Sequence, residues 1–143
     1  MTLFFFAVGV VAAVALIPLL LLTIVDPDSR IWPTPGPGSW QGYVFWPLFR
    51  SLNVLPFLLA VLDREQLLGL PAAIRLIALA ACGGAGLFYI YSILVLGRSN
   101  TYCGREGLVA RGVYRWTRNP QYAAAIPMFA TLAVAADSAP TYV

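Results

Sequence analysis

Residues 2–25 read TLFFFAVGVVAAVALIPLLLLTIV, an apolar run without a charged residue. About 20 consecutive apolar residues are enough for an α-helix to cross the hydrocarbon core of a bilayer. Pro18 lies inside the run and is expected to kink the helix without ending it, because lipid offers the backbone no other hydrogen-bonding partner. The run therefore predicts a retained transmembrane helix rather than a cleaved signal peptide.

The composition of the whole chain points the same way. Of its 143 residues, 60% are hydrophobic and 10% are charged, whereas about 25% of the residues of a soluble domain are charged. We predict an all-α fold, an integral membrane helical bundle of three to four transmembrane helices with a basic cytoplasmic loop. The length suits a single membrane domain over residues 1–143.

Other apolar runs predict the remaining spans. Segment 26–41 contains four prolines, so neither a helix nor a central strand is expected there. Segment 97–120 is polar and is predicted to be the cytoplasmic loop. The full set of expected spans is 3–25, 43–62, 72–96 and a partial span over 121–136.

Aromatic residues gather around the first connection: Trp32, Trp40, Tyr43 and Trp46. We interpret them as a belt at headgroup depth, and the alternative is an aromatic ligand cage. Arg50 follows within about two turns of the expected helix start, so its long stem can reach the headgroups. The alternative for Arg50 is a functional site inside the membrane.

The third expected span contains a block of small residues, ALAACGGAG, over residues 78–86. Small residues let a second helix approach closely, so we expect helix packing here, with a groove for a lipid tail as the alternative. Cys82 lies in this block and Cys103 in the polar segment that follows. They have no metal-binding spacing, and we interpret both as free thiols.

Arginine placement predicts the orientation in the membrane. If the 97–122 segment and the first connection lie on one side, that side holds seven of the nine arginines. The positive-inside rule then places it in the cytoplasm and the N-terminus outside. The absence of lysine hints at a GC-rich genome, and we expect a multi-pass protein of the bacterial inner (plasma) membrane.

The chain contains no histidine, which removes the commonest general base near neutral pH and the commonest metal ligand. Acid or base chemistry would have to use tyrosine, a carboxylate or water. We expect membrane lipids and a lipophilic small molecule as partners, and neither a metal nor a nucleic acid.

The sequence RNPQY has the signature of a helix start, because Asn119 suits the N-cap and Pro120 the first helical position. Unpaired N–H groups there, with Arg118 beside them, would hold a carboxylate or phosphate. Gly112 allows a tight turn shortly before, and Tyr114 places a phenol close to this anion site.

Arg111, Arg115 and Arg118 are spaced by four and three residues. They would form one basic stripe if this piece is helical. The alternative interpretation is an anchor that binds anionic lipids of the cytoplasmic leaflet.

The pattern formed by Gly112-x-Tyr114 and Arg118-Asn119-Pro120-x-Tyr122, after small hydrophobic spans, resembles the isoprenylcysteine carboxyl methyltransferase family and its phospholipid methyltransferase relatives. The resemblance implies a cytoplasm-facing membrane methyltransferase that binds S-adenosylmethionine and takes a lipophilic acceptor from the bilayer. Asn119 stands where the family often has histidine. The implied donor-binding residues are Gly112, Val113, Tyr114, Arg118, Asn119, Pro120 and Tyr122, and the candidate catalytic residues are Arg115 and Arg118.

Methyl transfer from a sulfonium needs alignment and a dry site more than strong acid or base groups, which suits a chain without histidine. The acceptor implied is an isoprenylcysteine-type carboxylate, a phospholipid amine or a small thiol. Arg98, Arg111 and Arg115 are candidates to orient an acceptor carboxylate.

The family continues into a further helix and a C-terminal motif with an acidic residue and spaced tyrosines, whereas this chain ends at Val143. We therefore expect either a fragment of a longer protein or a shortened member that cannot close the donor site by itself, and the short final span favours truncation. Two alternatives remain: an NAD(P)H-dependent membrane reductase of the steroid-reductase type, whose basic loop would bind the cofactor's phosphates, and a non-catalytic membrane protein.

Overall fold

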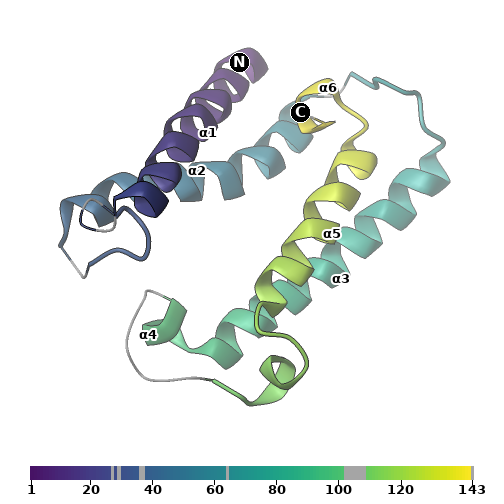
Figure 1. Ribbon diagram of the computed structural model, residues 1–143. Coiled ribbons are helices and arrows are strands. Elements are labelled where there is room, and N and C mark those ends of the chain that lie inside the picture. Colours follow the sequence, from purple (N-terminus) through teal and green to yellow (C-terminus); the bar gives the residue numbers. More distant parts are fainter. Residues whose placement is uncertain (27, 29, 36–37, 64, 102–108, 143) are drawn as a thin grey trace. The chain divides into compact units, whose positions relative to one another are not determined.

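The computed structural model describes residues 1–26, 28, 30–35, 38–63, 65–101 and 109–142, and only the backbone of residues 98 and 99. These residues form helices and no strand, which confirms the all-α prediction (Figure 1). The elements are α1 (Thr2–Val25), α2 (Trp40–Leu62), α3 (Ala72–Leu96), α4 (Arg98–Thr101), the 3₁₀ helix η2 (Gly112–Arg115), α5 (Pro120–Ala136) and α6 (Ala139–Tyr142).

Within the described part of the chain, three helices are long and apolar enough to cross a membrane, namely α1, α2 and α3. The shorter apolar helix α5 has 17 residues, in keeping with the expected partial span. α1 continues through Pro18 without a break, as the lipid argument predicts. Contacts divide the chain into two compact units, Met1–Leu62 and Asp63–Val143, and the single membrane domain stays a prediction.

α2 begins at Trp40, earlier than the predicted start at residue 43. The cause is Ser39, whose Oγ accepts a hydrogen bond from the Gly42 amide at 3.2 Å. Serine is a favoured N-cap because its oxygen satisfies an amide of the first turn. The expectation of a non-helical segment up to residue 41 was therefore wrong for its last two residues.

In the first unit, α1 packs against α2 and the connection between them folds back onto both. Ile31 is buried, and its amide donates to Thr23 Oγ1 at 2.9 Å. The Trp32 ring stacks on Phe45 with ring centroids 4.5 Å apart, and the Trp46 ring meets Phe45 edge-on at 5.3 Å. These rings pack on one another, which favours a structural cluster over a ligand cage.

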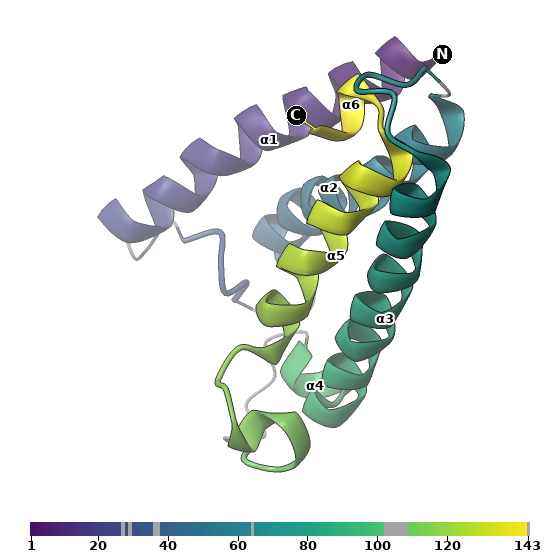
Figure 2. The same cartoon turned by 90° about the vertical axis from the view of Figure 1, so that its right-hand side faces the viewer.

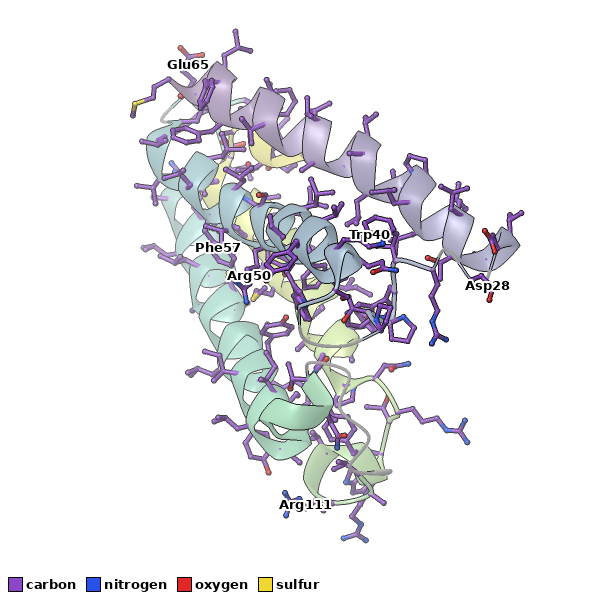
Figure 3. All side chains as sticks on the ribbon, turned by 90° about the vertical axis from the view of Figure 1, so that its left-hand side faces the viewer. Asp28, Trp40, Arg50, Phe57, Glu65 and Arg111 are labelled. Atoms are coloured by element: carbon purple, nitrogen blue, oxygen red, sulfur yellow. The ribbon has the colours of Figure 1, made fainter. Side chains whose placement is uncertain are left out.

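Trp40 and Tyr43 are instead exposed, at 59% and 73%, which suits a belt at headgroup depth. Arg50 lies ten residues after the start of α2, about 15 Å along the helix and deeper than the expected two turns. Its guanidinium reaches back over the Trp46 ring, 5.7 Å from the centroid (Figure 3). This direction is the one expected of a side chain that reaches for the headgroups.

In the second unit, α3 and α5 lie side by side and antiparallel (Figures 1 and 2). The small-residue block faces α5: Ala78 and Cys82 are buried, and a Cβ on Gly86 would lie 3.7 Å from Met128 Sδ. Residues four apart share one face of a helix, so the block confirms the packing interpretation. Cys82 is a free thiol, whereas Cys103 lies outside the described residues.

Asp137, at the end of α5, is fully buried. It bonds this helix end to the connection that precedes α3. Its carboxylate accepts hydrogen bonds from the amides of Leu68 at 3.0 Å and Leu70 at 2.8 Å. Arg75 Nε donates to the carbonyl of Ala135 at 3.0 Å, and so satisfies a helix C-terminus as a cation can. These contacts fix the α3–α5 pair at the end opposite to η2.

Candidate functional site

The turn at η2 is built around Gly112, which has a φ of 56°. Residues that carry a side chain rarely adopt this left-handed backbone conformation, whereas glycine does so freely. A Cβ here would also lie 3.1 Å from Val95 Cγ1 and 3.4 Å from the Tyr91 hydroxyl. Both backbone conformation and lack of space therefore require glycine, and the turn lies directly against the end of α3.

Tyr114, two residues later, reaches back to α3. Its hydroxyl donates to the carbonyl of Ser92 at 3.3 Å. Ser92 is fully buried and donates its own hydroxyl to the Phe88 carbonyl at 2.8 Å. Burial raises the pKa of the Tyr114 phenol above its ordinary value, and the side chain of Gln121 acts in the opposite direction.

The predicted helix start is confirmed: Asn119 is the N-cap of α5 and Pro120 its first residue. The Asn119 side chain, however, makes no capping hydrogen bond, and its backbone amide donates to Thr117 Oγ1 at 3.3 Å. The first helical bond runs from Ala123 to the Asn119 carbonyl, so the preceding amides have no partner within the helix. A helix start left open in this way favours an anion.

Three arginines precede this start in the sequence, and Arg111, Arg115 and Arg118 are all exposed. Figure 3 shows Arg111 projecting away from the ribbon. Helical structure covers residues 112–115 and then stops until residue 120, so the three do not form the single helical stripe that the spacing suggested. Arg111 directly precedes η2, Arg115 is its last residue, and Arg118 lies one residue before the N-cap of α5.

The remaining predicted site residues differ in burial. Pro120 is fully buried, which fixes the first turn of α5, whereas Tyr122 is 60% exposed. Val113 lies in η2 and is partly buried. The structure thus brings Gly112, Tyr114 and the start of α5 together at the end of α3. Arg105 and the side chain of Arg98 lie outside the described part of the chain.

Sequence reasoning missed two residues of this region, Ser92 and Gln121. Ser92 is a polar residue in an apolar span. Such a residue can mark a functional site, but its hydroxyl can equally well bond only to a carbonyl of its own helix. Gln121 occupies the unspecified position x of the Arg118-Asn119-Pro120-x-Tyr122 pattern, so the pattern did not predict a role for it. Its amide nitrogen Nε2 is buried and has no hydrogen-bond partner in the described structure.

Comparison with known families bears directly on this region. Residues 74–143 match the phospholipid methyltransferase family. The match confirms the suspected resemblance. It covers most of the second compact unit, including α3, η2 and α5. No curated protein and no solved structure gives a significant match.

The phospholipid methyltransferase match and the three membrane-length helices support an integral membrane methyltransferase in general. Methyltransferases of this family generally use S-adenosylmethionine, and the family name points to lipids as substrates. The residues at the start of α5 and in η2 lie within the matched segment. The start of α5 and η2 are therefore the candidate site for the function of this family.

Proposed function

We propose that this chain is a membrane methyltransferase that uses S-adenosylmethionine to methylate a lipophilic acceptor taken from the bilayer. The observation that supports this most directly is the open start of α5, beside Arg118 and the Gly112 turn, within the segment that matches the family. The acceptor classes are those with a reactive group at headgroup depth: an isoprenylcysteine-type carboxylate, a phospholipid amine or a small thiol.

The described residues fit such a donor in two respects. At Gly112 a Cβ would crowd the end of α3, so a glycine lets the turn lie close against that helix. At α5 the unpaired amides and Arg118 suit the carboxylate of the donor's amino-acid part. We assign donor binding to Gly112, Val113, Tyr114, Arg118, Asn119, Pro120 and Tyr122.

When bound, S-adenosylmethionine supplies an activated methyl group on a sulfonium. The protein's task is then to align donor and acceptor and to keep water away, which requires no general base of ordinary strength. We assign to Arg115, at the end of η2, the orientation of an anionic acceptor, and to Arg118 the pairing with the donor carboxylate. We infer from the positive-inside rule that both lie on the cytoplasmic side, and we take the membrane to be a bacterial inner membrane.

The test is calorimetric titration of S-adenosylmethionine into the purified chain and its Arg118→Ala variant. A hydrogen bond to a charged group contributes about 1.5–3 kcal/mol, and because Arg118 is exposed we expect the lower end, an affinity loss of about tenfold. Arg30→Ala is the matched control, because Arg30 is also exposed and lies in the first unit.

Three results would contradict the proposal. If the chain binds NADPH but not the methyl donor, the reductase is the better interpretation. If Arg118→Ala changes only the retention of anionic lipid, the arginines serve as an anchor. Equal losses in Arg118→Ala and Arg30→Ala would show that the effect is not local to the start of α5.

A further inference from the structure

Gln121 is the second residue of α5, and its side chain turns inward rather than into solvent. The amide nitrogen Nε2 is fully covered and lacks an acceptor among the described residues. Buried polar groups in folded proteins are nearly always hydrogen-bonded, and each exception calls for an explanation. Gln121 therefore holds a donor whose acceptor has to be found nearby.

The Tyr114 hydroxyl is an acceptor near Gln121, since the Gln121 side chain acts on this phenol. It donates its own proton to the Ser92 carbonyl at 3.3 Å, which is longer than the usual distance of about 2.7–2.8 Å. A hydroxyl has two lone pairs besides its donor, so it remains able to accept a bond. Gln121 lies close enough to lower the pKa of this phenol, although the amide is not in hydrogen-bonding geometry.

We propose that Gln121 is a positioning residue of the donor site, whose amide nitrogen donates to the Tyr114 hydroxyl and so holds the η2 turn against the start of α5. The inference rests on the proposed function, because it takes these two segments to be the two halves of the donor site. The bond joins the two halves in the free protein, and a donor that contacts both halves would strengthen it.

The bond would complete a chain of hydrogen bonds that links α5, η2 and α3. Gln121 would donate to the Tyr114 hydroxyl, which donates to the Ser92 carbonyl. Val95 Cγ1 lies 3.1 Å from where a Cβ on Gly112 would be, so the turn has little room to move further toward α3. The turn can then move only relative to the start of α5. The bond from Gln121 to Tyr114 would fix the distance between η2 and the start of α5. Tyr122, next in the chain, is 60% exposed and cannot perform this role.

The first experiment measures S-adenosylmethionine affinity by calorimetry for the full chain in lipid nanodiscs, with Gln121→Leu, Tyr114→Phe and the double variant. Gln121→Leu loses one hydrogen bond, so we expect about 2- to 10-fold weaker binding. Tyr114→Phe also loses the bond to the Ser92 carbonyl and should bind at least as weakly. The double variant should bind no more weakly than Tyr114→Phe, because the loss of the hydroxyl already removes the bond from Gln121. Gln41→Leu is the matched control, since Gln41 is the second residue of α2.

The second experiment follows the Tyr114 phenol itself, as the difference in phenolate absorbance between the wild type and Tyr114→Phe over a pH titration. A donor beside a phenolate stabilises the charged form, so Gln121→Leu should raise the pKa of Tyr114. Gln121→Glu should raise it further, because a carboxylate repels the phenolate. General loosening of the structure would expose the phenol and lower its pKa instead.

Additive affinity losses in the double variant would overturn the inference, as would unchanged donor affinity in Gln121→Leu. A wild-type chain that binds no donor would contradict the proposed function and with it the role in donor binding. The phenol titration separates the two cases. A shift of the Tyr114 pKa in Gln121→Leu would still establish the bond to Tyr114, whereas an unchanged pKa would show that this bond does not exist.

Discussion

At the scale of single residues, Gly112 shows how a backbone angle can restrict a site. Its φ of 56° strains any residue with a side chain, and a Cβ here would lie only 3.1 Å from Val95 Cγ1. We predict that Gly112→Ala destabilises the fold by about 1–2 kcal/mol, the usual cost of a left-handed alanine, and weakens donor binding by at least the same factor as loss of Arg118. Thermal unfolding and calorimetry measure the two effects.

Gly83→Ala is the control for that prediction, because a Cβ on Gly83 meets nothing within 4 Å. Alanine is the better helix former, and the substitution should leave stability unchanged or raise it by up to about 1 kcal/mol. If Gly112→Ala behaves like Gly83→Ala, the turn adapts to a side chain and the glycine requirement is mistaken.

At the scale of elements, the contact between α3 and α5 depends on residues four apart along α3. Gly86 faces α5, with Met128 Sδ 3.7 Å from the position of a Cβ, whereas Gly84 faces open space. We predict that Gly86→Leu destabilises the pair by about 1–3 kcal/mol, because it forces the two helices apart. Gly84→Leu should be tolerated.

The measurement is the thermal midpoint of each variant in detergent, together with S-adenosylmethionine affinity. Because η2 and the start of α5 rest on the end of α3, displacement of α5 should also weaken donor binding in Gly86→Leu. Equal stability of the Gly86 and Gly84 variants would show that the small-residue face is not the packing face.

At the scale of the whole molecule, Asp137 joins segments far apart in the sequence. Burial alone would raise the pKa of its carboxyl, but the amides of Leu70 and Leu68 and the charge of Arg75 lower it more, so the pKa lies below its ordinary value. A group whose pKa is lowered by folding stabilises the fold above its unfolded pKa, and this contribution is lost as the pH falls through the folded pKa.

We therefore predict that Asp137→Asn lowers the thermal midpoint at neutral pH, since an amide would place a donor against a backbone donor. The gap between wild type and variant should shrink once the pH falls below about 4. Unfolding curves of both proteins at about pH 7 and about pH 3 test this. Asp63→Asn is the control, and a gap that is independent of pH would contradict the assigned ionisation.

Much of the fold followed from the sequence because the bilayer restricts the choices. A run such as residues 2–25 has only one way to satisfy its backbone in lipid, and α3 began after Pro71 as predicted. The start of α2 was misplaced because Ser39, one polar residue in a proline-rich segment, gave a weak local signal. The RNPQY helix start was found because its N-cap and proline act within a single turn.

The sequence by itself determined the helical class, the apolar spans, the start of α5 and the resemblance of its second half to phospholipid methyltransferases, since these depend on local hydropathy and short motifs. Only the tertiary structure showed that a side chain at Gly112 would crowd Val95, that Gln121 Nε2 is buried near Tyr114, and that Asp137 binds the connection before α3. Burial and hydrogen-bond partners depend on which segments meet in space, and no local pattern in the chain carries that information.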